Sequence, residues 1–230
     1  MENNSASQKP LLGADNNALI ALVSVNVIVA ILLGFLRVVY YLEGFSIAEY
    51  QGEVFQIVTL IPQKIASHPW SLLTFSWVHA GFWILFTNMI WLTAFCNVLQ
   101  NMGANKHLFP IYFYSGLVAG GVYLCIGSSA PLLGAQVGVI ALAVAATTMA
   151  PNFKLFGNVI KGLPVWALTV FYLIFTGLSL TEQPWQQNVA IAVGSATGIG
   201  YALLLKRGTD LGRWMHQLLH LLNNSLKPKA

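Results

Sequence analysis

Residues 69–92 decide the fold, and they read Pro69-Trp-Ser-Leu-Leu-Thr-Phe-Ser-Trp-Val-His-Ala-Gly-Phe-Trp-Ile-Leu-Phe-Thr-Asn-Met-Ile-Trp-Leu92. The stretch begins with a Pro-Trp pair typical of a membrane interface and continues apolar for more than the thickness of a bilayer. Its strongly polar side chains are His79 and Asn88. Polar groups inside a membrane are costly unless they are paired, so both are candidates for function. Hydrogen bonding between neighbouring helices is the alternative interpretation.

The composition is that of a membrane protein, since 57% of the 230 residues are hydrophobic and 8% are charged, against about 25% charged in soluble domains. Repeated apolar segments predict one all-α domain with six transmembrane helices. The spans are expected at about residues 18–41, 70–97, 108–126, 132–149, 163–180 and 189–205. Residues 1–17 are expected to be a disordered tail, and residues 206–230 a tail with an amphipathic helix on the membrane surface.

The distribution of Lys and Arg predicts the orientation. An even number of spans puts both tails on one side, and that side then holds nine of the eleven Lys and Arg residues: Lys9, Lys106, Lys154, Lys161, Lys206, Arg207, Arg213, Lys227 and Lys229. Because cytoplasmic loops carry the excess of these residues, both termini are expected in the cytoplasm. The net charge of +4 therefore reflects orientation, and we expect no nucleic-acid partner.

The connection between the first two spans is long and carries Glu43, Glu49 and Glu53. We expect an interfacial loop with short helical pieces. Its glutamates form either a solvated face or a docking surface for a partner. No Cys, His, Asp or Glu cluster has the spacing of a metal site, and no cofactor is expected.

Glycines mark helix faces that can approach closely. Gly116 and Gly120 lie on one face of the third span, and the sixth span carries Gly194-x-x-x-Gly198. Small residues at such spacing allow two helices to pack closely in a membrane. Packing within the molecule is the first interpretation, and dimerisation is the alternative.

Taken together, these motifs resemble those of the rhomboid intramembrane serine proteases, in particular rhomboids of the Bacteroidetes type. The resemblance covers nearly the whole chain and implies a six-helix bundle in the inner membrane of a bacterium. The segments that carry it are Pro69–Thr74, Val78–Phe82, Asn88–Leu92, Tyr114–Gly121, Leu133–Ala135, Gly194–Gly198 and Lys206–Gly212.

In this family a serine at the start of the fourth span attacks the substrate, and a histidine on the sixth span is its base. A histidine one helical turn before an asparagine on the second span lines the oxyanion hole. The resemblance puts Gln136 at the serine position, Ile191 at the base position and Ile84 at the oxyanion histidine, and retains only Asn88. A serine hydroxyl needs a base, and a developing oxyanion needs preorganised donors. The expected protein is thus a pseudoprotease.

Inactive members of the family bind or scaffold other integral membrane proteins, and the resemblance implies the same role here. The candidate contacts with a partner are Asn88, Gln136 and Trp83. Gln136 offers donors and an acceptor, so it is expected either to pair with Asn88 or to contact the backbone of a client. No oligomeric state is predicted.

Two alternatives remain open. In the first alternative, the chain is an active protease with a non-standard site, for which His79 with Ser128 or Ser129 is the candidate pair. In the second alternative, the chain handles lipids or thins the bilayer, and the short fourth to sixth spans favour this interpretation.

Overall fold

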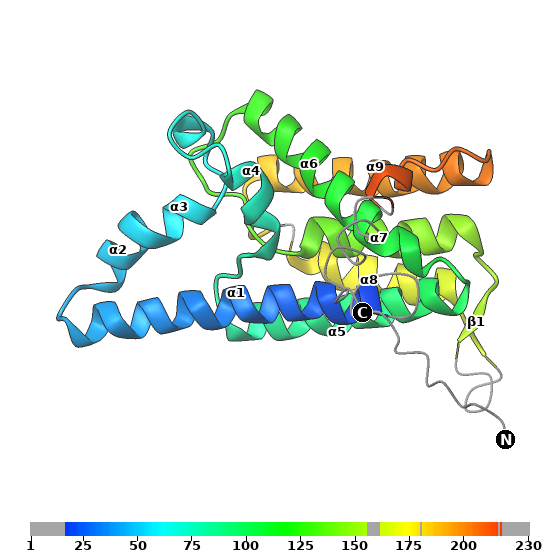
Figure 1. Cartoon of the computed structure of the whole chain (residues 1–230), viewed down its shortest axis with the longest axis horizontal. Helices are drawn as coiled ribbons and strands as arrows, with labels where there is room; N and C mark the ends of the chain where they lie inside the picture. Colours follow the sequence, from blue (N-terminus) through cyan, green and yellow to red (C-terminus); the bar gives the residue numbers. More distant parts are fainter. Residues whose placement is uncertain (1–16, 156–161, 180, 216, 218–230) are drawn as a thin grey trace, which may run out of the picture.

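The chain folds into a bundle of helices in the computed structural model, which describes residues 17–155, 162–179, 181–215 and 217 (Figure 1). The long helices are α1 Asn17–Leu42, α5 Phe82–Asn101, α6 Leu108–Ile126, α7 Gln136–Met149, α8 Val165–Ser179 and α9 Trp185–Lys206. Short segments join α1 to α5: α2 Ile47–Tyr50, a π-helical turn Gln51–Phe55, α3 Gln56–Val58, a 3-10 turn Pro62–Lys64, α4 Ser71–Thr74 and a 3-10 turn Phe75–Trp77. A 3-10 turn Asn105–His107 precedes α6, and β1 Lys154–Leu155 pairs antiparallel with β2 Leu163–Pro164.

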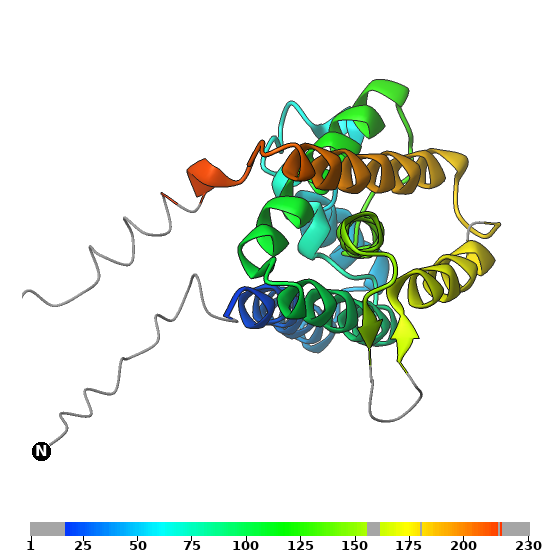
Figure 2. The same cartoon turned by 90° about the vertical axis from the view of Figure 1, so that its right-hand side faces the viewer.

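Helix α7 is the centre of the bundle. Figure 2 shows it end-on, between α9 on one side and α5 on the other, with α8 beside it. Every residue from Val137 to Ala143 is buried. Among the described helices, α8 packs closely on α7 but has few close backbone neighbours on α5.

Four of the described helices, α1, α5, α6 and α9, are long and apolar enough to cross a membrane. Helices α7 and α8 are also apolar, but their 14 and 15 residues are fewer than the about 20 that span a bilayer core. Because α7 is enclosed by other helices, its length is not dictated by contact with lipid. The mostly helical structure with these apolar helices is that of a multi-pass membrane protein, as the sequence predicts.

The glycines of α9 allow it to lie directly on α7. A Cβ atom at Gly194 would come within 2.5 Å of Val137 Cγ1 and 3.1 Å of its carbonyl oxygen. At Gly198 it would lie 2.7 Å from Ala141 Cα, an atom of the α7 backbone. Both glycines therefore serve packing within this chain.

The glycines of α6 leave space for the segment that precedes α5. A Cβ atom at Gly116 would lie 2.7 Å from Ser76 Oγ, and one at Gly120 would lie 2.8 Å from Leu72 Cδ1. The absence of these Cβ atoms lets α4 and the following 3-10 turn pack on α6.

The prediction of one continuous span at residues 70–97 is wrong. The chain forms α4 and a 3-10 turn, runs irregularly through residues 78–81, and begins α5 only at Phe82. The backbone carbonyls that would continue a helix are engaged elsewhere: Phe75 O accepts from Gly134 N at 2.9 Å, and Ser76 O accepts from the Tyr112 hydroxyl at 2.7 Å.

The fourth span is expected to begin at about residue 132, and the helix α7 begins four residues later, at Gln136. Leu132 forms an isolated antiparallel bridge with Leu60. Gly134 has a φ of 102°, a left-handed conformation that glycine adopts without steric cost. This turn directs the chain inward, so α7 begins inside the bundle.

The fifth and sixth spans are shifted as well. Helix α8 starts two residues later than predicted because residues 163–164 form β2, a strand that was not predicted. Helix α9 starts at Trp185 rather than 189, directly after Pro184. The glutamines at 186 and 187, which precede the predicted span, therefore belong to this helix.

The first connection contains short helical pieces, as predicted. Ser46 and Glu49 form a capping box at α2, and the two hydrogen bonds that Ser46 gives to the Glu49 carboxylate lower the pKa of this group. Glu53 accepts from the Tyr40 hydroxyl at 3.0 Å. Glu49 is therefore hydrogen-bonded within the connection, and Glu53 is hydrogen-bonded to α1, so neither carboxylate contacts only solvent.

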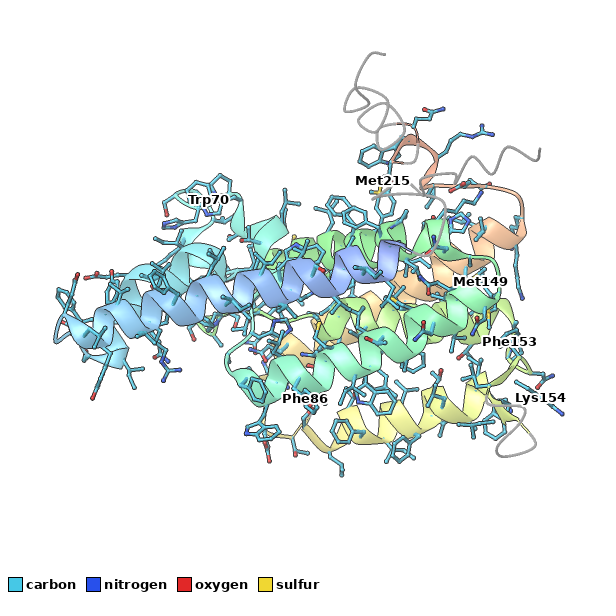
Figure 3. The ribbon with its side chains drawn as sticks, turned by 60° about the horizontal axis from the view of Figure 1, so that its bottom comes forward. Trp70, Phe86, Met149, Phe153, Lys154 and Met215 are labelled. Atoms are coloured by element: carbon cyan, nitrogen blue, oxygen red, sulfur yellow. The ribbon has the colours of Figure 1, made fainter. Side chains whose placement is uncertain are left out.

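The two ends of the bundle are distinct. Figure 3 shows Trp70 near the end formed by the first connection, and Met149, Phe153, Lys154 and Met215 toward the opposite end. Of the predicted tails, residues 1–16 lie outside the described residues, and Asn17 already belongs to α1. In the C-terminal tail, residues 213–215 and 217 are helical, and residues 216 and 218–230 lie outside the description.

Candidate functional site

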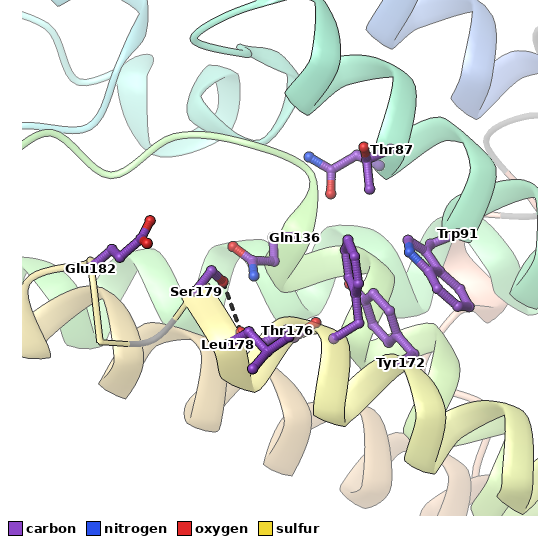
Figure 4. Close-up of a pocket in the computed structure, with 10 residues that line it drawn as sticks. Thr87, Trp91, Gln136, Tyr172, Thr176, Leu178, Ser179 and Glu182 are labelled. Atoms are coloured by element: carbon purple, nitrogen blue, oxygen red, sulfur yellow. Dashed lines mark hydrogen bonds between the residues drawn. The ribbon is translucent and has the colours of Figure 1, made fainter.

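A pocket of about 280 Å³ lies between α5, α7 and α8 (Figure 4). It receives side chains from all three helices and from the turn after α8. The lining residues are Thr87, Asn88, Trp91, Gln136, Tyr172, Phe175, Thr176, Leu178, Ser179 and Glu182. Figure 4 shows Glu182 at one end, Trp91 and Tyr172 at the other, and Gln136 between them.

Gln136 and Asn88 face this pocket from different helices. Gln136 is the first residue of α7, so it lies where the helix leaves its first N–H groups without intrahelical partners. Asn88 lies on α5, and only 9% of it is exposed. Within the described part of the chain, neither side-chain amide hydrogen-bonds to a protein group. The expected pairing of Gln136 with Asn88 is therefore not formed, and both amides remain available to a ligand.

The other predicted positions do not line the pocket. Ile191 is buried on α9, where the Ser195 hydroxyl donates to its carbonyl at 2.9 Å. Ile84 and Trp83 are 51% and 73% exposed on α5. Trp83 packs edge-on against a neighbouring aromatic ring, Phe86, at a centroid distance of 6.1 Å. The structure thus brings together two of the five predicted residues.

Sequence reasoning missed the contribution of α8. Tyr172, Thr176 and Ser179 succeed one another at helical spacing and present hydroxyl groups along one face of this helix. The Ser179 hydroxyl donates to the Thr176 carbonyl at 2.7 Å. This row of hydroxyls in an apolar helix is a sequence signal that could have located the third wall.

Aromatic contacts join α8 to α5 at the inner end of the pocket. The Trp91 ring centroid lies 4.8 Å from that of Tyr172 and 6.1 Å from that of Phe175. These rings form an apolar floor. The polar groups are concentrated between this floor and Glu182.

The alternative serine–histidine pair is not formed. Within the described ranges, neither ring nitrogen of His79 hydrogen-bonds to a serine, so the predicted pairing with Ser128 or Ser129 is absent. Ser67 Oγ does lie 2.9 Å from the Nδ1 atom of His68, but this pair of adjacent residues is part of the exposed first connection. No group of three metal-ligating side chains occurs in the part of the chain that the structure describes.

The rhomboid domain matches residues 66–208, which is more than half of the chain. The chain therefore belongs to the rhomboid family. A comparison with curated proteins found no match. The matched region extends from the first connection through α9 and includes all the helices that form the pocket.

Proposed function

We propose that this chain is a catalytically inactive rhomboid-family protein that binds other integral membrane proteins in the inner membrane of a bacterium. The observation that carries the proposal is Gln136 at the N-terminus of α7, in the pocket between α5, α7 and α8. This is the position that the family resemblance assigns to the nucleophile, and a carboxamide cannot form an acyl-enzyme. Ile191, at the position of the base, carries no group that can accept a proton.

The shape of the site favours a membrane-embedded partner. The pocket opens between α5 and α8, whose backbones pack closely on α7 rather than on each other. Its edge carries Phe175 and Leu178, both exposed apolar side chains, and its interior carries the free amides of Asn88 and Gln136. A partner helix with an irregular turn would cover the apolar edge and offer backbone groups to the amides.

The proposal includes six spans with both termini in the cytoplasm. The four long apolar helices support it, together with α7 and α8 as shorter apolar helices. Lys154 and Met215 lie toward one end of the bundle and Trp70 near the other, as this orientation requires (Figure 3).

The test is reconstitution of the purified chain into liposomes with single-span proteins that active rhomboids cleave. We expect binding without cleavage. The variant combining Gln136→Ser, Ile191→His and Ile84→His should regain at most trace cleavage, because the first-turn geometry and the oxyanion site are not preorganised for it. Cleavage by the unmodified chain, or labelling by a serine-reactive probe that one Ser→Ala substitution abolishes, would refute the proposal.

A further inference from the structure

We infer that the pocket between α5, α7 and α8 binds the headgroup of a phospholipid that carries an ammonium group. The phosphate lies at Gln136 and Asn88, the ammonium group at Glu182, and the acyl chains leave between α5 and α8. This ligand goes beyond the proposed binding of membrane proteins and does not depend on it.

The phosphate end of the site is built from hydrogen-bond donors. The N-terminus of the 14-residue helix α7 opens into the pocket at Gln136, and the free N–H groups and dipole of a helix N-terminus attract an anion. A second, independent observation points to a ligand: Asn88 is only 9% exposed, lines the pocket, and its side-chain amide has no hydrogen-bond partner among the described residues. This amide can donate hydrogen bonds to a phosphate oxygen that enters the pocket.

The ammonium end of the site is Glu182. This carboxylate lies on the turn after α8, at the end of the pocket away from Trp91 and Tyr172 (Figure 4). No salt bridge between described residues includes it, so no Lys, Arg or His of that part of the chain is paired with this carboxylate. A carboxylate beside a row of neutral donors fits a zwitterion, since an ammonium group makes charge-assisted hydrogen bonds to it.

The apolar edge distinguishes a lipid from a soluble phosphate ester. Phe175 and Leu178, both exposed, form the edge of the pocket on the side where α5 and α8 have few close backbone contacts. Acyl chains attached to the phosphate can pass there into the bilayer. The site thus offers a carboxylate to the ammonium group, two amides to the phosphate and an exposed apolar edge to the acyl chains of a lipid.

The test is native mass spectrometry of the detergent-solubilised chain, titrated with dioctanoyl phosphatidylethanolamine or dioctanoyl phosphatidylglycerol. Glu182→Gln removes the charge and keeps the shape, and Glu43→Gln is the matched control at an exposed carboxylate of the first connection. We expect Glu182→Gln to lower the affinity for phosphatidylethanolamine roughly fivefold and to leave the affinity for phosphatidylglycerol unchanged. Asn88→Leu should lower the affinity for both lipids, and Glu43→Gln should change neither affinity.

Equal affinity of the unmodified chain for the two lipids would overturn the inference, as would the same affinities in Glu182→Gln and Glu43→Gln. Glycerophosphoethanolamine, which lacks acyl chains, provides the second arm. If it displaces the lipid at an equal concentration, the ligand is a soluble phosphate ester and the lipid assignment fails. These titrations contain no membrane-protein partner, so their outcome is separate from that of the cleavage and binding assays.

Discussion

Replacing Gly198 by Ala tests the contact that holds α9 on α7. The added Cβ atom would lie 2.7 Å from Ala141 Cα and 2.9 Å from Ala141 C, both backbone atoms of a buried helix. A backbone cannot rotate away as a side chain does, so α9 must shift. Overpacking of a core costs typically about 1–3 kcal/mol, and this site belongs at the upper end of that range. For a chain of this size, ~3 kcal/mol lowers the melting temperature by roughly 6–12 °C.

Gly200→Ala is the matched control on the same helix, because a Cβ atom there has no neighbour within 4 Å. It should leave stability unchanged or raise it by less than about 1 kcal/mol, since alanine favours the helix more than glycine does. The assay is thermal unfolding in detergent, followed by circular dichroism. Melting of the Gly198→Ala variant within about 2 °C of the Gly200→Ala variant would show that α9 does not depend on this close approach.

Two further predictions concern the connection and the interrupted second span. Tyr112→Phe leaves the Ser76 carbonyl without its 2.7 Å hydrogen bond and should lower the free energy of unfolding by about 1–3 kcal/mol in the same assay. The exposed Tyr41→Phe, the control, should leave it almost unchanged. Equal effects of the two substitutions would contradict the role of this bond. The Glu49 carboxyl has its pKa lowered from 4.5 by the Ser46 hydrogen bonds, so its stabilisation of α2 is present above pH 4.5 and is lost as the pH falls below that value. Hydrogen-exchange protection of residues 47–50 should fall over that range in the unmodified chain but not in Glu49→Gln, and an identical pH dependence in both would refute the assignment.

The sequence predicted the helices whose ends coincide with the ends of an apolar run. Apolar length places the first span at 18–41 and the third at 108–126, against α1 Asn17–Leu42 and α6 Leu108–Ile126. In both cases the apolar run and the helix end together. Hydropathy alone is sufficient where no distant group competes for the backbone.

The break before α5 could not be predicted from residues 70–97. It depends on Gly134 N and the Tyr112 hydroxyl, which bind the carbonyls of Phe75 and Ser76 from far along the chain. An apolar pattern has no information about such bonds, so the predicted span continued through the irregular segment. The same reason explains the late start of α7, where Leu132 pairs with Leu60.

The pocket was only half predicted. Asn88 and Gln136 followed from the family resemblance, and both face the cavity. The role of Glu182 and of the α8 hydroxyls depends on where α8 packs, which is a property of the tertiary structure. The proposed lipid and the proposed partner helix would occupy the same opening between α5 and α8, so we expect each to exclude the other.

The most direct test of the account is site-specific photo-crosslinking in membranes, with the reactive group at Leu178. Leu178 is 73% exposed and lines the pocket, and Leu173, 40% exposed on the same helix and not part of the lining, is the control position. The account predicts that Leu178 yields an adduct with an intact membrane-spanning protein and that Leu173 does not. Equal adducts from both positions, or an adduct at Leu178 that contains only a cleaved fragment, would contradict it.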